Sequence, residues 1–339
     1  MRRQASLISH ISVAFSLLVV HTWLASVARA QDPGAWRDPS KHEVKFITVD
    51  EDVQLEVLDW GGAGRALVLL AGSGNTAHVF DDFAAKLSDC CHVYGITRRG
   101  FGSSSHPPTG YDDQRLADDV LRVLDALHLD HPVLAGHSMA GGELTTIGRQ
   151  HSERISGLIY VDATADPAGD PSRSDPEFVA AEKELPDAMR KPPARDWDRS
   201  SFGAYQASQR RANVPVFPES ELRQSNAELP DGRVGPYKAS TSDINAAIGR
   251  GQIKRDYSNI RVPVLVFIDY PWPPGDPRRP STVIVDGREY QPVNDDERAA
   301  IIAYARVERK RVDQRTANLK RSVPSARVVE QPGAVITCF

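Results

Sequence analysis

The chain has 339 residues, of which 40% are hydrophobic and 25% charged, and its formal net charge is −4. A chain of this length can bury a sizeable core, and we expect one α/β domain with an insertion; the composition is ordinary for a globular protein. The negative charge argues against nucleic acid as a partner, and the sequence offers no basic stretch for a membrane surface.

Residues 1–30 have the pattern of a signal peptide. Two arginines stand near the start, residues 11–20 are apolar (ISVAFSLLVV), and a small-x-small cleavage site precedes Gln31. The apolar run is too short to span a bilayer comfortably, so we expect no stable membrane anchor. We expect cleavage after Ala30 and an exported protein, periplasmic or secreted.

The next part of the chain alternates between strand and helix patterns. Residues 43–49 and 53–58 predict two strands, and the apolar run 66–70 (ALVLL) predicts a strand buried on both faces of a parallel sheet. This rhythm predicts βαβ units and a doubly wound, mostly parallel sheet of the α/β class. The further expected elements are strands at 92–96, 132–135 and 155–161 and helices at 113–127 and 142–149.

The rhythm breaks at about residue 165. As far as residue 257 the chain is rich in proline, serine and charge, with short amphipathic segments such as 177–189, and this predicts a mostly helical cap insertion. The core should therefore comprise residues 43–164 and 258–339, with the cap at 165–257. In the second core part we expect a strand at 262–268 (VPVLVFI), a helix that begins after Asn294 and runs to about Leu319, and a last strand at 326–329.

Three cysteines are present, at positions 90, 91 and 338. Neighbouring cysteines seldom bridge each other because the geometry is strained. We expect Cys90 and Cys91 to be small buried residues at the start of a strand. No metal-binding spacing exists, and we expect neither a metal nor a cofactor.

The segment Gly136-His137-Ser138-Met139-Ala140-Gly141 carries the strongest chemical signal. It lies between an apolar strand and a helix, as a nucleophile elbow does, with Ala140 in place of the second glycine of G-x-S-x-G. So sharp a turn needs small residues around the serine and lifts its hydroxyl above the carboxyl end of the sheet. We expect Ser138 to be a nucleophile.

A second loop of small residues, Ala71–Asn75, directly follows the buried strand ALVLL. Such a loop allows a backbone N–H group to reach the same place as the elbow. We expect the N–H groups of Ser73 and Met139 to form an oxyanion hole.

These motifs together resemble the α/β-hydrolase superfamily. The resemblance rests on LEVLDWGGAGRALVLLAGSGNTAHVFDDF, GITRRGFGSSSHP, PVLAGHSMAGGEL and GLIYVDA, and returns at VPVLVFI and ARVVEQPGA. More narrowly, the chain resembles exported bacterial enzymes of the serine esterase and aminopeptidase-like branch. The loop that contains Arg99 is similar to the family's D-x-R-G-x-G loop, with Thr97 where an aspartate is usual, and Arg99 should bind backbone carbonyls or a carboxylate.

The resemblance implies a triad in the order serine, acid, histidine. Aligned on VPVLVFI, the usual acid position falls on Trp272. Asp269 lies three residues earlier and is the first choice for the acid. Asp276 and Asp162 are the alternatives, since a local shift or a different branch of the family would use them.

The histidine expected by resemblance is missing. The family pattern after the last strand places it at Ile336, whereas all ten histidines of this chain lie at or before His151. His137 should be a packing residue inside the elbow, while His78 and His106 should border the substrate entrance. We expect the carboxyl-terminal sequence to be truncated or shifted in frame, so that the base and a closing helix are lost.

The sequence therefore predicts a serine hydrolase that cleaves an ester or amide bond of a small molecule through an acyl-enzyme at Ser138. The alternative is a catalytically impaired or non-catalytic protein of the same fold that keeps the pocket for binding. In that case Met139, Trp272 and the proline-rich cap would line an apolar cleft.

Overall fold

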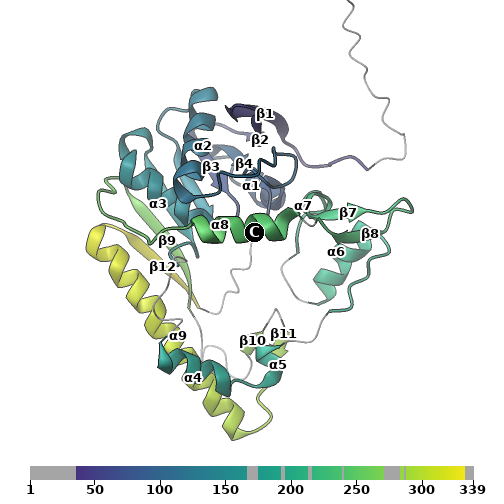
Figure 1. Ribbon diagram of the computed structural model, residues 1–339, viewed down its shortest axis with the longest axis vertical. Helices are drawn as coiled ribbons and strands as arrows, with labels where there is room; N and C mark the ends of the chain where they lie inside the picture. Colours follow the sequence, from purple (N-terminus) through teal and green to yellow (C-terminus); the bar gives the residue numbers. More distant parts are fainter. Residues whose placement is uncertain are drawn as a thin grey trace, which may run out of the picture. The chain divides into compact units, whose positions relative to one another are not determined.

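The computed structural model describes residues 36–165, 175–191, 195–212, 216–238, 240–270, 283–285 and 288–332 (Figure 1). The chain divides into a unit that ends at Asp38 and a second unit from Pro39 to Phe339. Every element named below belongs to the second unit. The predicted signal peptide lies outside the described residues. Within the described ranges, no helix combines the length and the apolar character needed to cross a membrane.

An eight-stranded sheet forms the centre of this unit, in the order β1-β2-β4-β3-β5-β6-β9-β12. Strands β1 and β2 join it antiparallel, and β4, β3, β5, β6, β9 and β12 run parallel to one another. The predicted mostly parallel, doubly wound sheet is confirmed. The strands are β1 (Glu43–Asp50), β2 (Val53–Gly61), β3 (Arg65–Leu70), β4 (Cys91–Ile96), β5 (Val133–His137), β6 (Gly157–Val161), β9 (Val264–Tyr270) and β12 (Arg327–Pro332).

Three long helices flank the sheet, α2 (Asp113–Ala126), α3 (Gly141–Gln150) and α9 (Asp295–Ser322). The side chain of Asp112 caps α2 by accepting a hydrogen bond from the N–H of Arg115. Asn294 caps α9 in the same way, by accepting from the N–H of Glu297, and three acids in the first turn suit the positive end of the helix dipole. The helix start that the sequence predicts at Asn294 is thus confirmed.

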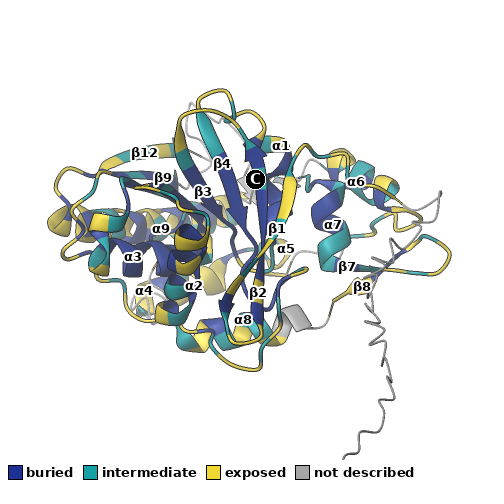
Figure 2. Cartoon of the chain, turned by 90° about the horizontal axis from the view of Figure 1, so that it is seen from above, coloured by how far each residue is buried: buried dark blue, intermediate teal, exposed yellow. Residues whose placement is uncertain are grey.

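The two faces of the sheet carry two separate hydrophobic clusters. Val68 and Leu70 of β3 belong to the cluster that α2, α3 and α9 cover, while Leu67 and Leu69 belong to the other. This alternation follows from the two-residue period of a strand. The second cluster includes residues of the 3-10 helix η1 (Ala77–Phe80) and of α1 (Asp81–Ala84). Because both faces are packed, the central strands are almost entirely buried (Figure 2).

An apolar cavity of 560 Å³ lies against the second face of the sheet. Its walls include Leu67, Ala135, Ile159 and Phe267, one from each of four neighbouring strands, together with Phe83. Residues 333–339, to which the expectation of a lost closing helix refers, lie outside the described residues.

The segment between β6 and β9 folds into helices and one small sheet. The helices are α4 (Pro176–Glu184), α5 (Asp187–Arg190), α6 (Phe202–Arg211), α7 (Glu219–Ser225) and α8 (Ser240–Gly251). Helix α4 packs along α9 (Figure 1). The ring of Phe178 on α4 contacts the ring of Tyr304 and the guanidinium group of Arg311 on α9. We did not predict the hairpin of β7 (Asn226–Glu228) and β8 (Val234–Tyr237), nor that of β10 (Val283–Val285) and β11 (Arg288–Tyr290).

The expectation that Cys90 and Cys91 are buried is wrong. Cys90 is exposed, Cys91 is half-buried, and both are free thiols with their Sγ atoms 3.1 Å apart. The physical reason is their position. Cys90 precedes β4 and Cys91 is its first residue, where the chain enters the sheet from the surface, and burial begins only at Val93.

Arg99, in the loop after β4, binds a carboxylate as the resemblance implies. Its Nε and Nη2 atoms donate to the two carboxylate oxygens of Asp119 on α2, each at 2.6 Å. Both side chains are only 3% exposed. This bidentate geometry satisfies two charges that would be costly to bury alone, and it fixes the loop on α2.

We expect Asp119→Asn to lower the free energy of unfolding by about 3–5 kcal/mol, because it leaves the buried Arg99 guanidinium without its counter-charge. The matched control is Asp125→Asn on the same helix, whose carboxylate pairs with Arg154 and is 61% exposed. That change should cost at most ~1 kcal/mol. Urea unfolding of both variants measures the difference, and equal losses would contradict the assignment.

Candidate active site

Ser138 lies at the tip of the turn from β5 into α3. Its φ angle is +51°, in the left-handed region that few non-glycine residues adopt. Ser138 is exposed, although Gly136, His137, Ala140 and Gly141 around it are all buried. The turn therefore holds one hydroxyl group at the surface of an otherwise packed segment.

Glycine is required on either side of Ser138 because neighbouring atoms leave no room for a side chain, and not because the backbone needs the conformational freedom of glycine. A Cβ atom on Gly136 would lie 2.8 Å from the Cβ of Ala140. One on Gly141 would lie 1.9 Å from the carbonyl oxygen of Ala163, which a real side chain cannot do. The need for small residues that the sequence suggests thus has a definite cause in the packing of α3 against the chain after β6.

The loop that follows β3 packs directly against this turn. A Cβ atom on Gly72 would lie 3.5 Å from the Cβ of Ser138 and 2.6 Å from Nδ1 of His137. The structure therefore brings together the two loops that contain Ser73 and Ser138. Ser73 is exposed, and its hydroxyl donates to Oδ1 of Asn245 on α8 at 2.7 Å.

Met139 is the second residue of the short helix η2 (Ser138–Ala140). The first N–H groups of a helix have no partner within it, so they are available to a ligand. The Met139 side chain packs with Phe101, Tyr111 and Ile248. It therefore contributes to an apolar cluster beside the serine.

Asp162 occupies the end of the strand next to β5. His137 pairs in register with Val161, so Ser138 and Asp162 hold corresponding positions at the ends of adjacent strands. Burial raises the pKa of Asp162 to about 6; Glu308 contributes in the same direction and Arg315 opposes it.

Asp269 lies one strand farther along, on β9. It is half-buried and pairs in register with Gln331 of β12. Asp162 is tied to the same strand, because its N–H donates to the carbonyl of Phe267 at 2.8 Å. Asp276, Trp272 and Ile336 lie outside the described residues.

His137, His106 and His78 have three different surroundings. His137 is buried and lines the apolar cavity beside the sheet. His106 is exposed, with Nε2 3.2 Å from the carbonyl oxygen of Gly102. The expectation that His78 borders the entrance is wrong, because it is only 4% exposed. Its Nδ1 lies 3.2 Å from Asp81 and its Nε2 3.5 Å from Glu56, and these carboxylates hold the ring inside.

Asp81 is the centre of a buried polar cluster that we did not predict. Its Oδ1 accepts hydrogen bonds from His42 and Trp60, and its Oδ2 from His78 and from Ser220 on α7. These donors hold the pKa of Asp81 well below its usual range despite its burial. His42, His78 and Asp81 are residue types that bind metals, but four donors already occupy the lone pairs of this carboxylate. We therefore interpret the cluster as an internal hydrogen-bond network.

Glu221 on α7 is a second buried carboxylate that the sequence does not indicate. It is 1% exposed and accepts hydrogen bonds from Asn75 and Thr76, about 145 residues earlier in the chain. Burial raises the pKa of Glu221 to about 7, although the hydrogen bonds from Thr76 and Asn75 oppose the shift. Asn75 is the last residue of the small-residue loop after β3 and Thr76 follows it directly, so this carboxylate belongs to the surroundings of the site.

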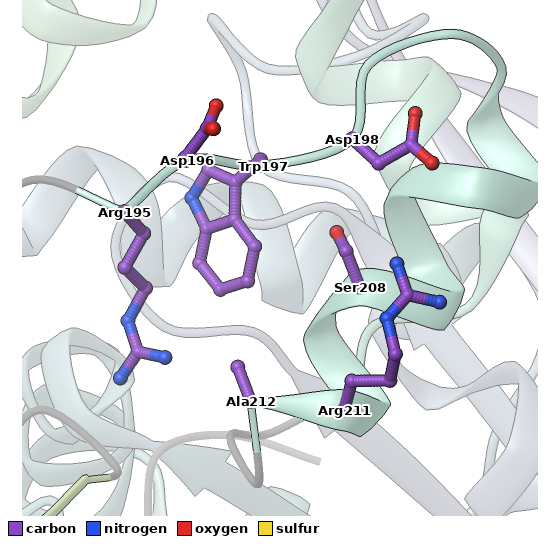
Figure 3. A pocket seen from close by; sticks show the side chains of 7 residues that line it. All are labelled: Arg195, Asp196, Trp197, Asp198, Ser208, Arg211 and Ala212. Atoms are coloured by element: carbon purple, nitrogen blue, oxygen red, sulfur yellow. The ribbon is translucent and has the colours of Figure 1, made fainter.

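A separate polar pocket of 380 Å³ lies at helix α6 (Figure 3). The Trp197 ring points into it, and the Arg195 guanidinium lies 5.1 Å from the ring centroid. Ser208 and Arg211 of α6 complete the other side. None of its lining residues belongs to the elbow or to the loop after β3.

The raised pKa of Glu221 predicts how stability depends on pH. The unfolded chain loses this proton near pH 4.5 and the folded chain near pH 7, so the unfolded state binds fewer protons between these values. The free energy of unfolding should therefore fall as pH rises from about 4.5 to 7, by up to about 3 kcal/mol from this group. Glu221→Gln should remove that part of the slope in urea unfolding curves at several pH values. Glu219→Gln, on the same helix, should retain it, and parallel curves for both variants would contradict the prediction.

Comparison with known proteins places this geometry in a family. The model of the alpha/beta hydrolase family matches residues 67–334. A 2-(acetamidomethylene)succinate hydrolase of Mesorhizobium japonicum is 24% identical over 206 residues, 60% of this chain and 70% of that protein. A non-heme chloroperoxidase of Streptomyces lividans is 31% identical over 233 residues, 65% of this chain and 79% of that one. Several other curated relatives are matched over less than half of their length.

A solved structure agrees with the sequence relatives. The crystal structure of E-2-(acetamidomethylene)succinate hydrolase has a TM-score of 0.55 and 19% identity, over 86% of this chain and 91% of that chain. At this identity the likeness shows the fold alone. The family model covers most of the chain, including the elbow and the sheet from β3 to β12, and the chain therefore belongs to the alpha/beta hydrolase family.

Proposed function

We propose that this protein is a serine hydrolase that cleaves an ester or amide bond of a small molecule through an acyl-enzyme at Ser138. The observation that supports this most is the elbow itself. An exposed serine with a φ angle of +51° is held between buried small residues at the end of a buried strand. Strained backbone of this kind persists only where the surrounding packing enforces it, and it concentrates at functional sites.

In the proposed mechanism Ser138 Oγ attacks the carbonyl carbon of the substrate, and the carbonyl oxygen becomes an oxyanion. The N–H groups of Ser73 and Met139 would hold this oxyanion, and α3 would direct the positive end of its dipole toward it. Collapse of the tetrahedral intermediate would break the ester or amide bond and release the alcohol or amine, which would take up the proton that Ser138 loses, and the acyl-enzyme would remain. Attack by water on the acyl-enzyme would then release the acid, and a proton from that water would restore the serine hydroxyl. The contact of Gly72 with Ser138 supports these roles, since it brings the two loops together.

We retain Asp269 as the proposed acid of the triad. The family pattern places the base shortly after β12, and Asp269 pairs with Gln331 near the end of that strand. Asp269 on β9 is therefore nearer to the expected base than Asp162 is. Asp162 follows β6, where its position corresponds to that of Ser138 after β5, and β9 separates β6 from β12. Asp162 is the alternative and Asp276 the third choice.

The weak point of the triad is its base, since residue 336 is isoleucine. Loss of the histidine costs serine hydrolases on the order of 10⁴ to 10⁶ in turnover. The isoleucine at position 336 favours a second candidate function, in which the protein is catalytically impaired or non-catalytic and binds a small molecule. The names of the relatives support the chemical class, since one gives an acetamido compound as the substrate of a hydrolase and another names an esterase.

Covalent labelling tests the two candidates, because a fluorophosphonate reacts readily only with a serine that its surroundings activate as a nucleophile. A fluorophosphonate probe should label the folded wild-type protein at Ser138, as located by mass spectrometry of the labelled peptide. Ser138→Ala should abolish the labelling, and Ser200→Ala, which removes an exposed cap hydroxyl, should leave it unchanged. Failure of the folded wild-type protein to react would favour the binding function.

We also propose that the protein is exported and that its signal peptide is removed after Ala30. The charged start, the apolar run and the small-x-small site before Gln31 support this proposal. Amino-terminal sequencing of the protein from the periplasm or the medium should begin at Gln31. A protein that keeps residues 1–30 would contradict it.

A further inference from the structure

Four consecutive residues of the loop after β3 form hydrogen bonds with the cap insertion. The loop is the one proposed to hold the oxyanion, and the partners lie on three different cap elements, α7, β8 and α8. The hydrogen bonds join Ser73 Oγ to Asn245, the carbonyl of Gly74 to the Tyr237 hydroxyl, the Asn75 amide to Glu221, and the N–H and hydroxyl of Thr76 to Glu221.

Glu221 makes the largest share of these contacts and is the most deeply buried partner. Its Oε1 accepts from Asn75 Nδ2 at 3.0 Å and from the Thr76 N–H at 3.2 Å. Its Oε2 accepts from the same N–H at 3.2 Å and from the Thr76 hydroxyl at 2.5 Å. One carboxylate thus binds three donors from two neighbouring loop residues, which fixes both the backbone and the side chains there.

The cap helix that carries Glu221 is itself anchored to the core beside it. The neighbouring Ser220 donates to Asp81 Oδ2 at 2.5 Å, and Asp81 belongs to α1 of the core. On the other side of Glu221, Leu222 is buried in a cluster with Phe202 and Val234 of the cap. The carboxylate is therefore held from both sides, and the loop cannot shift away from Glu221 without breaking several hydrogen bonds at once.

Burying a carboxylate costs free energy, so packing alone does not explain why Glu221 lies buried against the loop. Glu221 provides acceptors for the N–H and hydroxyl of Thr76, which would otherwise be left unsatisfied in a buried space, and for the amide of the half-buried Asn75. Thr76 and Asn75 lie within three residues of Ser73, so their position sets the path of the loop toward Ser138.

We propose that Glu221 is a positioning residue of the catalytic site, which fixes the oxyanion loop 72–76 from the cap. The proposal rests on the proposed function, since it assigns Glu221 to the loop that carries the Ser73 N–H group. Glu221 touches neither substrate nor serine in this role. It acts through Asn75 and Thr76, and it makes the precision of the oxyanion hole depend on how the cap is seated.

The experiment compares the mature wild-type protein with Glu221→Ala, Glu221→Gln and the control Glu219→Gln. Glu219 lies on the same helix but pairs with Arg223. Hydrogen exchange of the peptide that contains residues 72–76 measures the loop itself, independently of activity. The rate of Ser138 labelling by a fluorophosphonate, resolved into probe affinity and the rate of the covalent step, measures the consequence for the site.

We expect Glu221→Ala to raise exchange in the loop at least tenfold and to slow the covalent step by 10- to 100-fold, with little change in probe affinity. This is below the 10²- to 10³-fold loss typical of deleting an oxyanion donor, since the donor is displaced and not removed. Glu221→Gln keeps one acceptor oxygen and should restore part of both effects, without the charge. The control should match the wild type in both measurements.

Unchanged exchange in the loop for both Glu221 variants would overturn the proposal, whatever the labelling shows. A general rise in exchange along the whole chain would also overturn it, since that result marks a merely structural residue. If Glu221→Ala does not fold, the Gln variant decides alone. If the wild type is not labelled at Ser138, the proposed function fails, while local loosening of the loop would still support the positioning of residues 72–76 by Glu221.

Discussion

The contact between Gly141 and the carbonyl oxygen of Ala163 is the constraint on which the site depends. A side chain at position 141 would come within 1.9 Å of that oxygen, so only glycine lets α3 start so close to the end of β6. The turn before it must then reverse within a few residues, which forces Ser138 into the left-handed region and out of the packed interior. The exposure of the serine is thus a result of how tightly one helix packs against the sheet.

Buried carboxyl groups join the layers around this turn, and each accepts several hydrogen bonds. Asp119 fixes the Arg99 loop on α2, Asp81 gathers two histidines, a tryptophan and a serine, and Glu221 binds the loop after β3. Such groups add little net stability compared with apolar packing, but removing one partner lowers the free energy of unfolding strongly. These hydrogen-bonded groups therefore determine which loop packs against which element. Apolar contacts alone would allow a loop to shift slightly along its partner.

The parts of the fold that could be predicted are those with a local pattern. The run 66–70 identifies β3 because a strand buried on both faces is continuously apolar, and Asn294 followed by acids identifies the start of α9. The short strands of the β7–β8 hairpin have three and four residues, too few to show a period. The role of Glu221 could not be predicted from the sequence either, because its partner Thr76 is 145 residues away and no local pattern around position 221 indicates that contact.

The backbone conformation at Ser138 determines which residue would give the most stable fold at this position. A non-glycine residue in this conformation costs roughly 1–3 kcal/mol, and glycine would adopt it without strain. A sequence designed only to hold this backbone would therefore have glycine at position 138. Serine at this position makes the fold less stable than glycine would, and it places an exposed hydroxyl group at the tip of the turn.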